Sequence, residues 1–150
     1  MNMINRRNLL LAGVVLSVAP SLAGAATGFD THIKDAALGG YDAVAYFAEK
    51  AAKPGDPSNK LNWNGVDWYF TSAANMKLFA ASPEKYAPQY GGHCAFAAAK
   101  GAVAPGDPEA WTVFKDKLYI NLSTAIREKW SQDIPGYIIQ ADKNWPNLSK

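Results

Sequence analysis

A pattern that occurs twice along the chain constrains the fold more than any other feature. The first copy reads "KPGDPSNKLNWNGVDWYFTSAANMKLF" from Lys53, and the second reads "APGDPEAWTVFKDKLYINLSTAIREKW" from Ala104. Each copy has a Pro-Gly-Asp-Pro loop, two strand-like runs, a serine and a helix-like run. Four pairs match at offsets of 50 or 51 residues: Pro54 with Pro105, Phe70 with Ile120, Ser72 with Ser123, and Phe79 with Trp130. The recurrence predicts two ββα-like units.

Local signals agree with this arrangement. Asn64-Gly65 favours the positive φ angles of a tight hairpin turn between two aromatic runs. Ser72 can cap a helix whose apolar face includes Phe79. Asp56 and Asp107 are predicted turn formers, because an aspartate side chain readily accepts hydrogen bonds from nearby backbone N–H groups. We therefore predict an α+β fold, in which the hairpins form a small antiparallel sheet packed by helices.

The stretch "YGGHCAFAAAKG" lies between the two copies and, by this alignment, has no repeat partner. Its alanine-rich part, residues 94–100, favours a helix ended by Gly101. Special chemistry is therefore expected in this insert or in the segment from Tyr41 to Phe47, rather than in the repeated scaffold.

The C-terminal residues after Trp130 show helical spacing. Ile138, Ala141 and Trp145 lie along one stripe of such a helix, and Pro146 is expected to end it. We predict that this helix closes over the sheet.

The N-terminus has the organisation of a secretory signal. Arg6-Arg7 is followed by an apolar run too short to cross a bilayer and then by small residues up to Ala25. The arginine pair also resembles a twin-arginine export signal. We predict a signal peptide over residues 1–25, a leading segment over 26–39 and one domain over 40–150. The mature protein is then periplasmic or secreted, with no stable membrane anchor.

Charge and cysteine usage narrow the possible partners. Removal of the signal takes Arg6 and Arg7 from the 15 basic residues and leaves 13, equal to the 13 acidic residues. A neutral protein has no general electrostatic attraction to nucleic acid. Cys94 is the single cysteine, so no intramolecular disulfide can form.

Glycine-rich phosphate loops, zinc-protease helices and Gly-x-Ser-x-Gly elbows are absent from the sequence, and no catalytic residue is assigned.

The segments "GYDAVAYF", "WNGVDWYFTSAANMKLFAASPEKYAPQYGGHCAFAAAKG" and "PEAWTVFKDKLYINLS" resemble the exported, single-domain branch of the YHS-domain proteins. The resemblance extends from Gly40 to Trp145. YHS domains are related to small cysteine-bearing metal-binding modules, but the corresponding places here, residues 41–45 and 70–75, have no cysteine. The ligands of those relatives therefore cannot be transferred. Within the segments that carry the resemblance we predict four ligand contacts: Tyr41, Asp42, Tyr86 and Tyr90.

A transition-metal site is the leading functional hypothesis. Cys94, His93, His32 and Met76 are ligand types that suit copper, and zinc is the alternative metal. Adjacent side chains diverge on a regular helix or strand, so His93 and Cys94 could share one ion only from an irregular turn. Gly91-Gly92 would permit such a turn.

Two other hypotheses remain open. The protein could be a scaffold that binds a small molecule or another protein, with Cys94 buried and inert, because free cysteine is among the most buried residue types. Alternatively, Cys94 at a helix start could act as a nucleophile with His32 as its base. An aromatic set could provide a stacking platform for a sugar or a base, although hairpin aromatics are more often core residues: Trp63, Trp68, Tyr69, Tyr86 and Tyr90.

Overall fold

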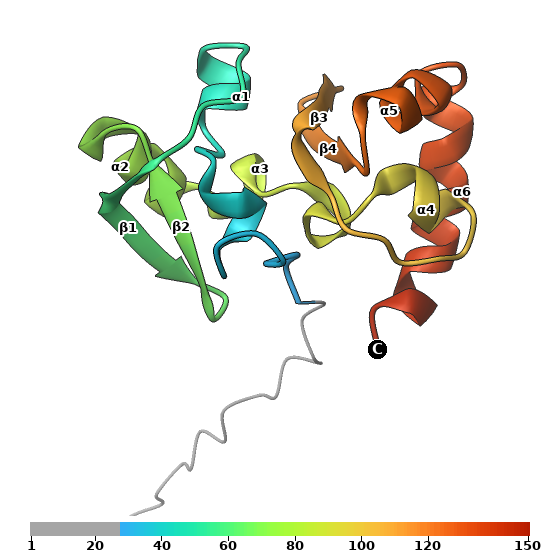
Figure 1. The fold of residues 1–150 in the computed structure, drawn as a ribbon, viewed down its shortest axis with the longest axis horizontal. Coiled ribbons are helices and arrows are strands. Elements are labelled where there is room, and N and C mark those ends of the chain that lie inside the picture. Colours follow the sequence, from blue (N-terminus) through green and yellow to red (C-terminus); the bar gives the residue numbers. More distant parts are fainter. Residues whose placement is uncertain (1–27) are drawn as a thin grey trace, which may run out of the picture.

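The computed structural model describes residues 28–150, so the predicted signal peptide with Arg6-Arg7 lies outside the described residues. The chain forms two lobes that lie side by side (Figure 1). We call residues 36–86 the first lobe and residues 89–148 the second lobe. None of the helices within residues 28–150 combines the length and the apolar character needed to span a bilayer.

The two lobes contain the same kinds of element in the same order. The first lobe contains α1 (Ala45–Ala48), β1 (Asp56–Trp63), β2 (Val66–Phe70), α2 (Ala73–Ala81) and α3 (Pro83–Tyr86). The second contains α4 (Ala95–Ala99), β3 (Asp107–Phe114), β4 (Lys117–Asn121), α5 (Thr124–Trp130) and α6 (Ile134–Leu148). Two 3-10 turns, Ala37–Gly40 and Gln89–Gly92, precede α1 and α4. The α+β prediction is confirmed, but each hairpin forms its own two-stranded antiparallel sheet instead of sharing one.

The turn and cap signals are confirmed. Asn64 and Gly65 have φ angles of 52° and 77° at the tip of the first hairpin, as a type I′ turn requires. The Ser72 hydroxyl accepts a hydrogen bond of 3.1 Å from the N–H of Asn75. The Ser123 hydroxyl accepts one of 3.2 Å from the N–H of Ile126 at the start of α5. These serines satisfy backbone donors that an uncapped helix would leave unpaired.

The structure corrects the prediction that "YGGHCAFAAAKG" is an unrepeated insert. Leu38, Gly39 and Gly40 have φ angles of 53°, 60° and 83°, and Tyr90, Gly91 and Gly92 repeat them at 55°, 62° and 82°. This left-handed conformation is costly for residues with a side chain, so its recurrence shows that residues 90–100 are the second copy of residues 38–48.

Backbone hydrogen bonds extend the same correspondence. The N–H of Asp42 donates to the carbonyl of Lys53 at 2.8 Å, and the N–H of Cys94 donates to the carbonyl of Ala104 at 2.9 Å. Phe70 and Asn121 both end their strands, opposite Asp56 and Asp107. The predicted match of Phe70 with Ile120 is therefore wrong by one residue.

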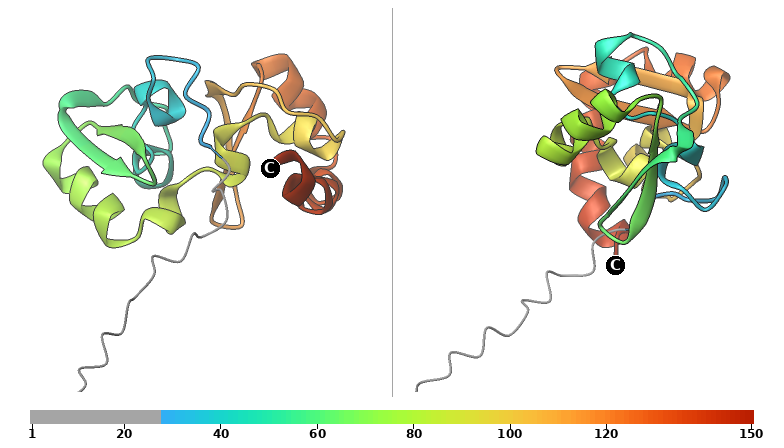
Figure 2. Two further views of the ribbon diagram at one scale, coloured as in Figure 1. Left: turned by 90° about the horizontal axis from the view of Figure 1, so that it is seen from below. Right: turned by 90° about the vertical axis from the view of Figure 1, so that its left-hand side faces the viewer.

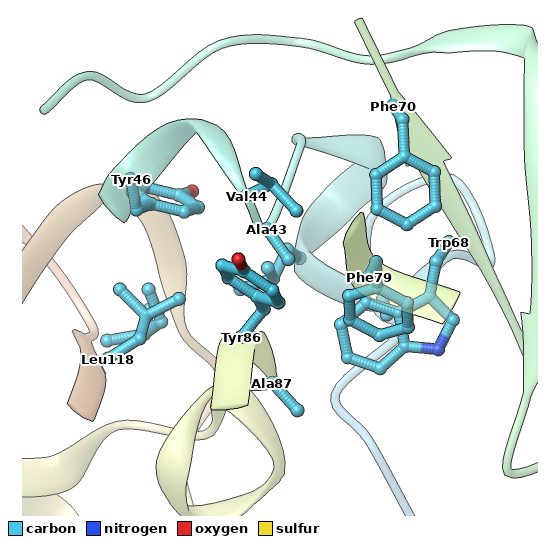
Figure 3. Packing of buried hydrophobic residues seen from close by; sticks show 12 residues of the cluster. Ala43, Val44, Tyr46, Trp68, Phe70, Phe79, Tyr86, Ala87 and Leu118 are labelled. Carbon is cyan, nitrogen blue, oxygen red and sulfur yellow. The ribbon is translucent and has the colours of Figure 1, made fainter. Parts of the chain in front are cut away.

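Strand β4 joins the lobes, because its side chains alternate between two hydrophobic clusters. Leu118 and Ile120 pack into a cluster with first-lobe residues such as Tyr46 and Tyr86 (Figure 3). Tyr119 belongs to a second cluster, around the fully buried Trp130. The two units are thus parts of one folded body, with a shared core.

The C-terminal helix differs from its prediction at its end. Helix α6 runs beside α4 (Figure 2), and its Ile138 also packs in the cluster that contains Tyr119 and Phe114 of the second hairpin. The side-chain amide of Asn144 donates to the carbonyls of Ala98 and Ala99 at 3.0 and 3.1 Å, which satisfies the C-terminal end of α4. Pro146 lies inside α6 and does not end it. A proline in the last turn removes only one helical hydrogen bond, and this loss is tolerated there.

Candidate ligand-binding cleft

The Cys94 thiol is buried and already has partners. Cys94 is the N-cap residue of α4, as the sequence predicts for a helix starting there, and only 1% of its surface is exposed. Its Sγ accepts from the N–H of Ala97 at 3.5 Å and donates to Oδ1 of Asn121 at 3.6 Å. The sulfur therefore faces the interior, and neither solvent nor an added ligand reaches it directly.

The other three predicted metal ligands lie in different surroundings. Nδ1 of His93 is 3.0 Å from the carbonyl oxygen of Tyr90. Nδ1 of His32 is 2.7 Å from Oδ1 of Asp30, and Met76 packs against the first hydrophobic cluster. Among residues 28–150 no group of three or more His, Cys, Asp or Glu side chains is placed to hold a metal ion. The structure does not bring the four candidates together.

Asp42 is a fully buried structural centre. Its Oδ1 accepts from the N–H groups of Val44 and Ala45 at 2.9 and 3.3 Å. Its Oδ2 accepts from the N–H and the hydroxyl of Thr71 and from the side-chain amide of Asn75, each at 2.8 Å. These five hydrogen bonds tie α1 to the start of α2 and leave the carboxylate no free position for a ligand.

Two of the predicted ligand tyrosines have structural contacts instead. The Tyr41 hydroxyl donates to Oε1 of Glu109 at 2.8 Å and links the two lobes. Tyr86 is buried in the first cluster, with its ring 5.5 Å from that of Phe47 in an edge-to-face arrangement. Such a pair stabilises a core by more than the area it buries.

Tyr90, the fourth predicted ligand residue, does line an open cleft of about 510 Å³ at the junction of the lobes. The cleft is formed by four separate stretches of the chain, which supply aromatic, small and polar side chains: Phe29, Trp63, Asn64, Glu84, Ala87, Pro88, Gln89, Tyr90, Gly91, Asp142, Trp145 and Pro146.

Two aromatic pairs form the apolar part of the cleft. Phe29 and Trp63 have ring centroids 5.6 Å apart with an interplanar angle of 46°. Tyr90 and Trp145 have centroids 5.5 Å apart at an angle of 62°. The Tyr90–Trp145 pair is edge-to-face and the Phe29–Trp63 pair is tilted, and both lie at separations at which aromatic contacts are favourable. Trp63 of the first lobe and Trp145 of the second therefore each line the cleft as part of an aromatic pair.

The Tyr90 ring is positioned by a carboxylate. Its hydroxyl donates to Oδ1 of Asp142 on α6 at 2.8 Å. Burial, together with this hydrogen bond, raises the pKa of Tyr90 above its ordinary value. The hydroxyl therefore stays protonated and keeps donating at neutral pH.

Phe29 reaches the cleft because Asp30 fastens the N-terminal segment to the second lobe. The Asp30 N–H donates to the carbonyl of Gly91 at 2.8 Å, and the Gly106 N–H donates to Oδ2 of Asp30 at 2.6 Å. Burial alone would raise the pKa of Asp30, but the hydrogen bonds from Gly106 and His32 lower it overall. The ionised carboxylate is therefore part of what holds Phe29 against Trp63.

Sequence reasoning found only part of this cleft. Trp63 and Tyr90 belong to the aromatic set considered as a stacking platform, whereas Trp68 of that set is buried in the core. Phe29 lies before the predicted domain of residues 40–150. The sequence pattern indicated Trp145 only as part of the apolar stripe of the C-terminal helix. Nothing in the sequence pattern connects these positions, which are brought together by the junction of the lobes.

Comparisons with protein-family models, with curated proteins and with solved structures found no match to this chain. The resemblance to YHS-domain proteins therefore stays a prediction.

Proposed function

We propose that the protein is an exported binding module that holds a small cyclic or planar molecule in the cleft between its lobes. The observation that carries the proposal is the meeting of two aromatic pairs, Phe29 with Trp63 and Tyr90 with Trp145, around one hollow. Small-molecule sites are concave, mostly apolar and marked by a few fixed polar groups. The periplasmic or secreted location is part of this proposal, from the predicted signal peptide.

Size and polarity support a small ligand over a protein partner. A volume of about 510 Å³ falls within the range of roughly 300–1,000 Å³ typical of small-molecule pockets. Asn64 and Gln89 also line the cleft, and a side-chain amide offers both donors and an acceptor. Aromatic rings and amides in one hollow can stack a cyclic molecule and fix its orientation.

A thiol-dependent reaction receives no support from the contacts of Cys94. Cys94 is 1% exposed and does not line the cleft, and the hydrogen bonds of its sulfur run to Ala97 and Asn121. Copper or zinc binding likewise stays a prediction that these contacts do not favour. Titrating metal-free protein with Cu(I), Cu(II) and Zn(II), beside Cys94→Ala, tests it; stoichiometric binding that the variant loses would restore the metal hypothesis.

A fragment library tests the proposal itself. Cyclic neutral, anionic and cationic compounds would be screened by tryptophan fluorescence and by the thermal unfolding midpoint. Binders should lose affinity about tenfold or more in both Trp63→Leu and Trp145→Leu, because each variant removes one aromatic wall. The matched control is Ile139→Ala, which changes an exposed apolar residue on the same helix as Trp145. A library without binders, or binders indifferent to both tryptophan variants, would refute the proposal.

A further inference from the structure

The charge of the cleft points to a particular class of ligand. Two carboxylates, Glu84 and Asp142, line the cleft, and none of its lining residues is basic. No Lys, Arg or His nitrogen within residues 28–150 lies within 4.0 Å of either carboxylate, because the ion pairs of this region involve other residues. The hollow therefore combines aromatic faces with two carboxylates that form no ion pair within the described part of the protein.

The aromatic faces are also free of the protein's own cations. Within the described residues, lysine ammonium groups lie over the rings of Tyr86, Phe96, Tyr137 and Phe114. None lies over Phe29, Trp63, Tyr90 or Trp145. The face of an aromatic ring carries negative electrostatic potential and attracts cations, most strongly for tryptophan.

Asp142 contributes in two ways. One oxygen, Oδ1, accepts the Tyr90 hydroxyl and so fixes the ring. The carboxylate lies on α6, three residues before Trp145. Residues three apart share one face of a helix. His93 contacts the Trp145 ring at a centroid distance of 5.6 Å but does not line the cleft. A cation lying on Trp145 would therefore be close to a carboxylate.

From this combination we infer that the cleft selects organic cations, such as molecules with a methylated ammonium head, over neutral or anionic molecules of the same shape. The inference rests on the proposed function, because it names the ligand class of the same cleft. The four aromatic residues line the same hollow as Glu84 and Asp142, so an ammonium head bound there would meet both aromatic rings and the opposite charge. A methylated ammonium suits this site because its charge is spread over an apolar surface, which loses little hydration on contact with aromatic rings.

Three probes of matched shape test the inference: choline, its neutral carbon analogue 3,3-dimethylbutan-1-ol, and the anion 3,3-dimethylbutanoate. Dissociation constants would be measured by NMR titration of the full mature chain at low salt. Choline should bind about tenfold more tightly than the neutral alcohol, and the anion should bind most weakly. Glu84→Gln and Asp142→Asn should each weaken the binding of choline about threefold more than they weaken the binding of the alcohol.

Glu128→Gln is the matched control, because Glu128 is an exposed carboxylate on α5 outside the cleft. Equal affinities for the three probes, a preference for the alcohol or the anion, or no binding of choline at tens of millimolar would each overturn the inference. The proposed function would survive any of these results if neutral or anionic library compounds bind and depend on Trp63 and Trp145. The proposed function and the inference would be refuted together only if no compound of any charge binds in the cleft.

Discussion

Cys94 occupies in the second lobe the position that Asp42 occupies in the first. Each follows a left-handed turn ended by a glycine, each donates its N–H to the loop before the hairpin, and each accepts a backbone N–H at the start of a short helix. The carboxylate of Asp42 satisfies five donors, whereas the Cys94 thiol contacts Ala97 and Asn121. The single cysteine is thus explained by its place in a repeated structural motif.

The first prediction concerns the buried carboxylate of Asp42. Asp42→Ala should lower the free energy of unfolding by about 3 kcal/mol, because it leaves buried N–H and amide donors without an acceptor. Urea unfolding monitored by tryptophan fluorescence gives this value. Asp56→Ala is the control, since Asp56 is an exposed turn residue that accepts one bond from Ser58, and its replacement should change stability little. A small effect of Asp42→Ala would contradict the structural role.

The thiol of Cys94 should be inert in the folded protein. A thiol reagent should fail to label native protein within the time needed to label unfolded protein completely, because a sulfur with 1% exposure reacts only after opening of the structure. Cys94→Ala should cost about 1 kcal/mol through loss of two weak hydrogen bonds. Rapid stoichiometric labelling under native conditions would show instead that the sulfur is accessible and would reopen the catalytic hypothesis.

Stability should depend on pH through Asp30. Its pKa is lowered in the folded state, so the ionised carboxylate stabilises the fold at pH values above the ordinary aspartate range of about 4, and this stabilisation is lost as the pH falls through the lowered pKa. Asp30→Asn should therefore be less stable by about 1 kcal/mol at pH 7, with the difference closing as the pH falls through the lowered pKa of Asp30. Asp35→Asn, at an exposed position, should follow the wild type throughout. A constant difference at every pH would argue against an electrostatic anchor.

Gly91 should link the left-handed turn to the cleft. Its φ angle is +62°, and an added Cβ would lie 2.9 Å from the carbonyl oxygen of Gly28. Gly91→Ala should therefore displace the segment that carries Phe29, and ligand affinity should fall. Gly65→Ala is the matched control, because Gly65 also has a positive φ of +77° but a Cβ there has no neighbour within 4 Å. Both variants should lose about 1 kcal/mol of stability, but only Gly91→Ala should lose binding. Equal ligand affinities in the two variants would show that Gly91 does not position Phe29 in the cleft.

The sequence predicted the local elements well because their signals are local. Asn64-Gly65 encodes a hairpin turn, and Ser72 and Ser123 encode helix starts, through contacts within a few residues. The first part of the repeat has one signal in the sequence, because Gly39-Gly40 recurs as Gly91-Gly92. The pairs that follow, Tyr41-Asp42 and His93-Cys94, share no chemistry, and the positive φ of Leu38 and Tyr90 is not evident from residue identity.

The cleft could not be predicted for a different reason. Phe29, Trp63, Tyr90 and Trp145 are distant in sequence and meet only because β4 joins the lobes and α6 lies beside α4. The metal hypothesis lacks geometric support because it grouped residues by ligand type alone: Cys94, His93, His32 and Met76. In the fold, each of these side chains has separate partners.

The indole N–H resonances of the five tryptophans test the central claim most directly. Uniformly labelled protein would be titrated with choline and with the tightest-binding library compound. The account predicts that the signals of Trp63 and Trp145 shift together and saturate at one dissociation constant, while those of Trp111 and Trp130, which do not line the cleft, stay in place. Shifts confined to Trp111 or Trp130, or cleft signals that no compound moves, would contradict it.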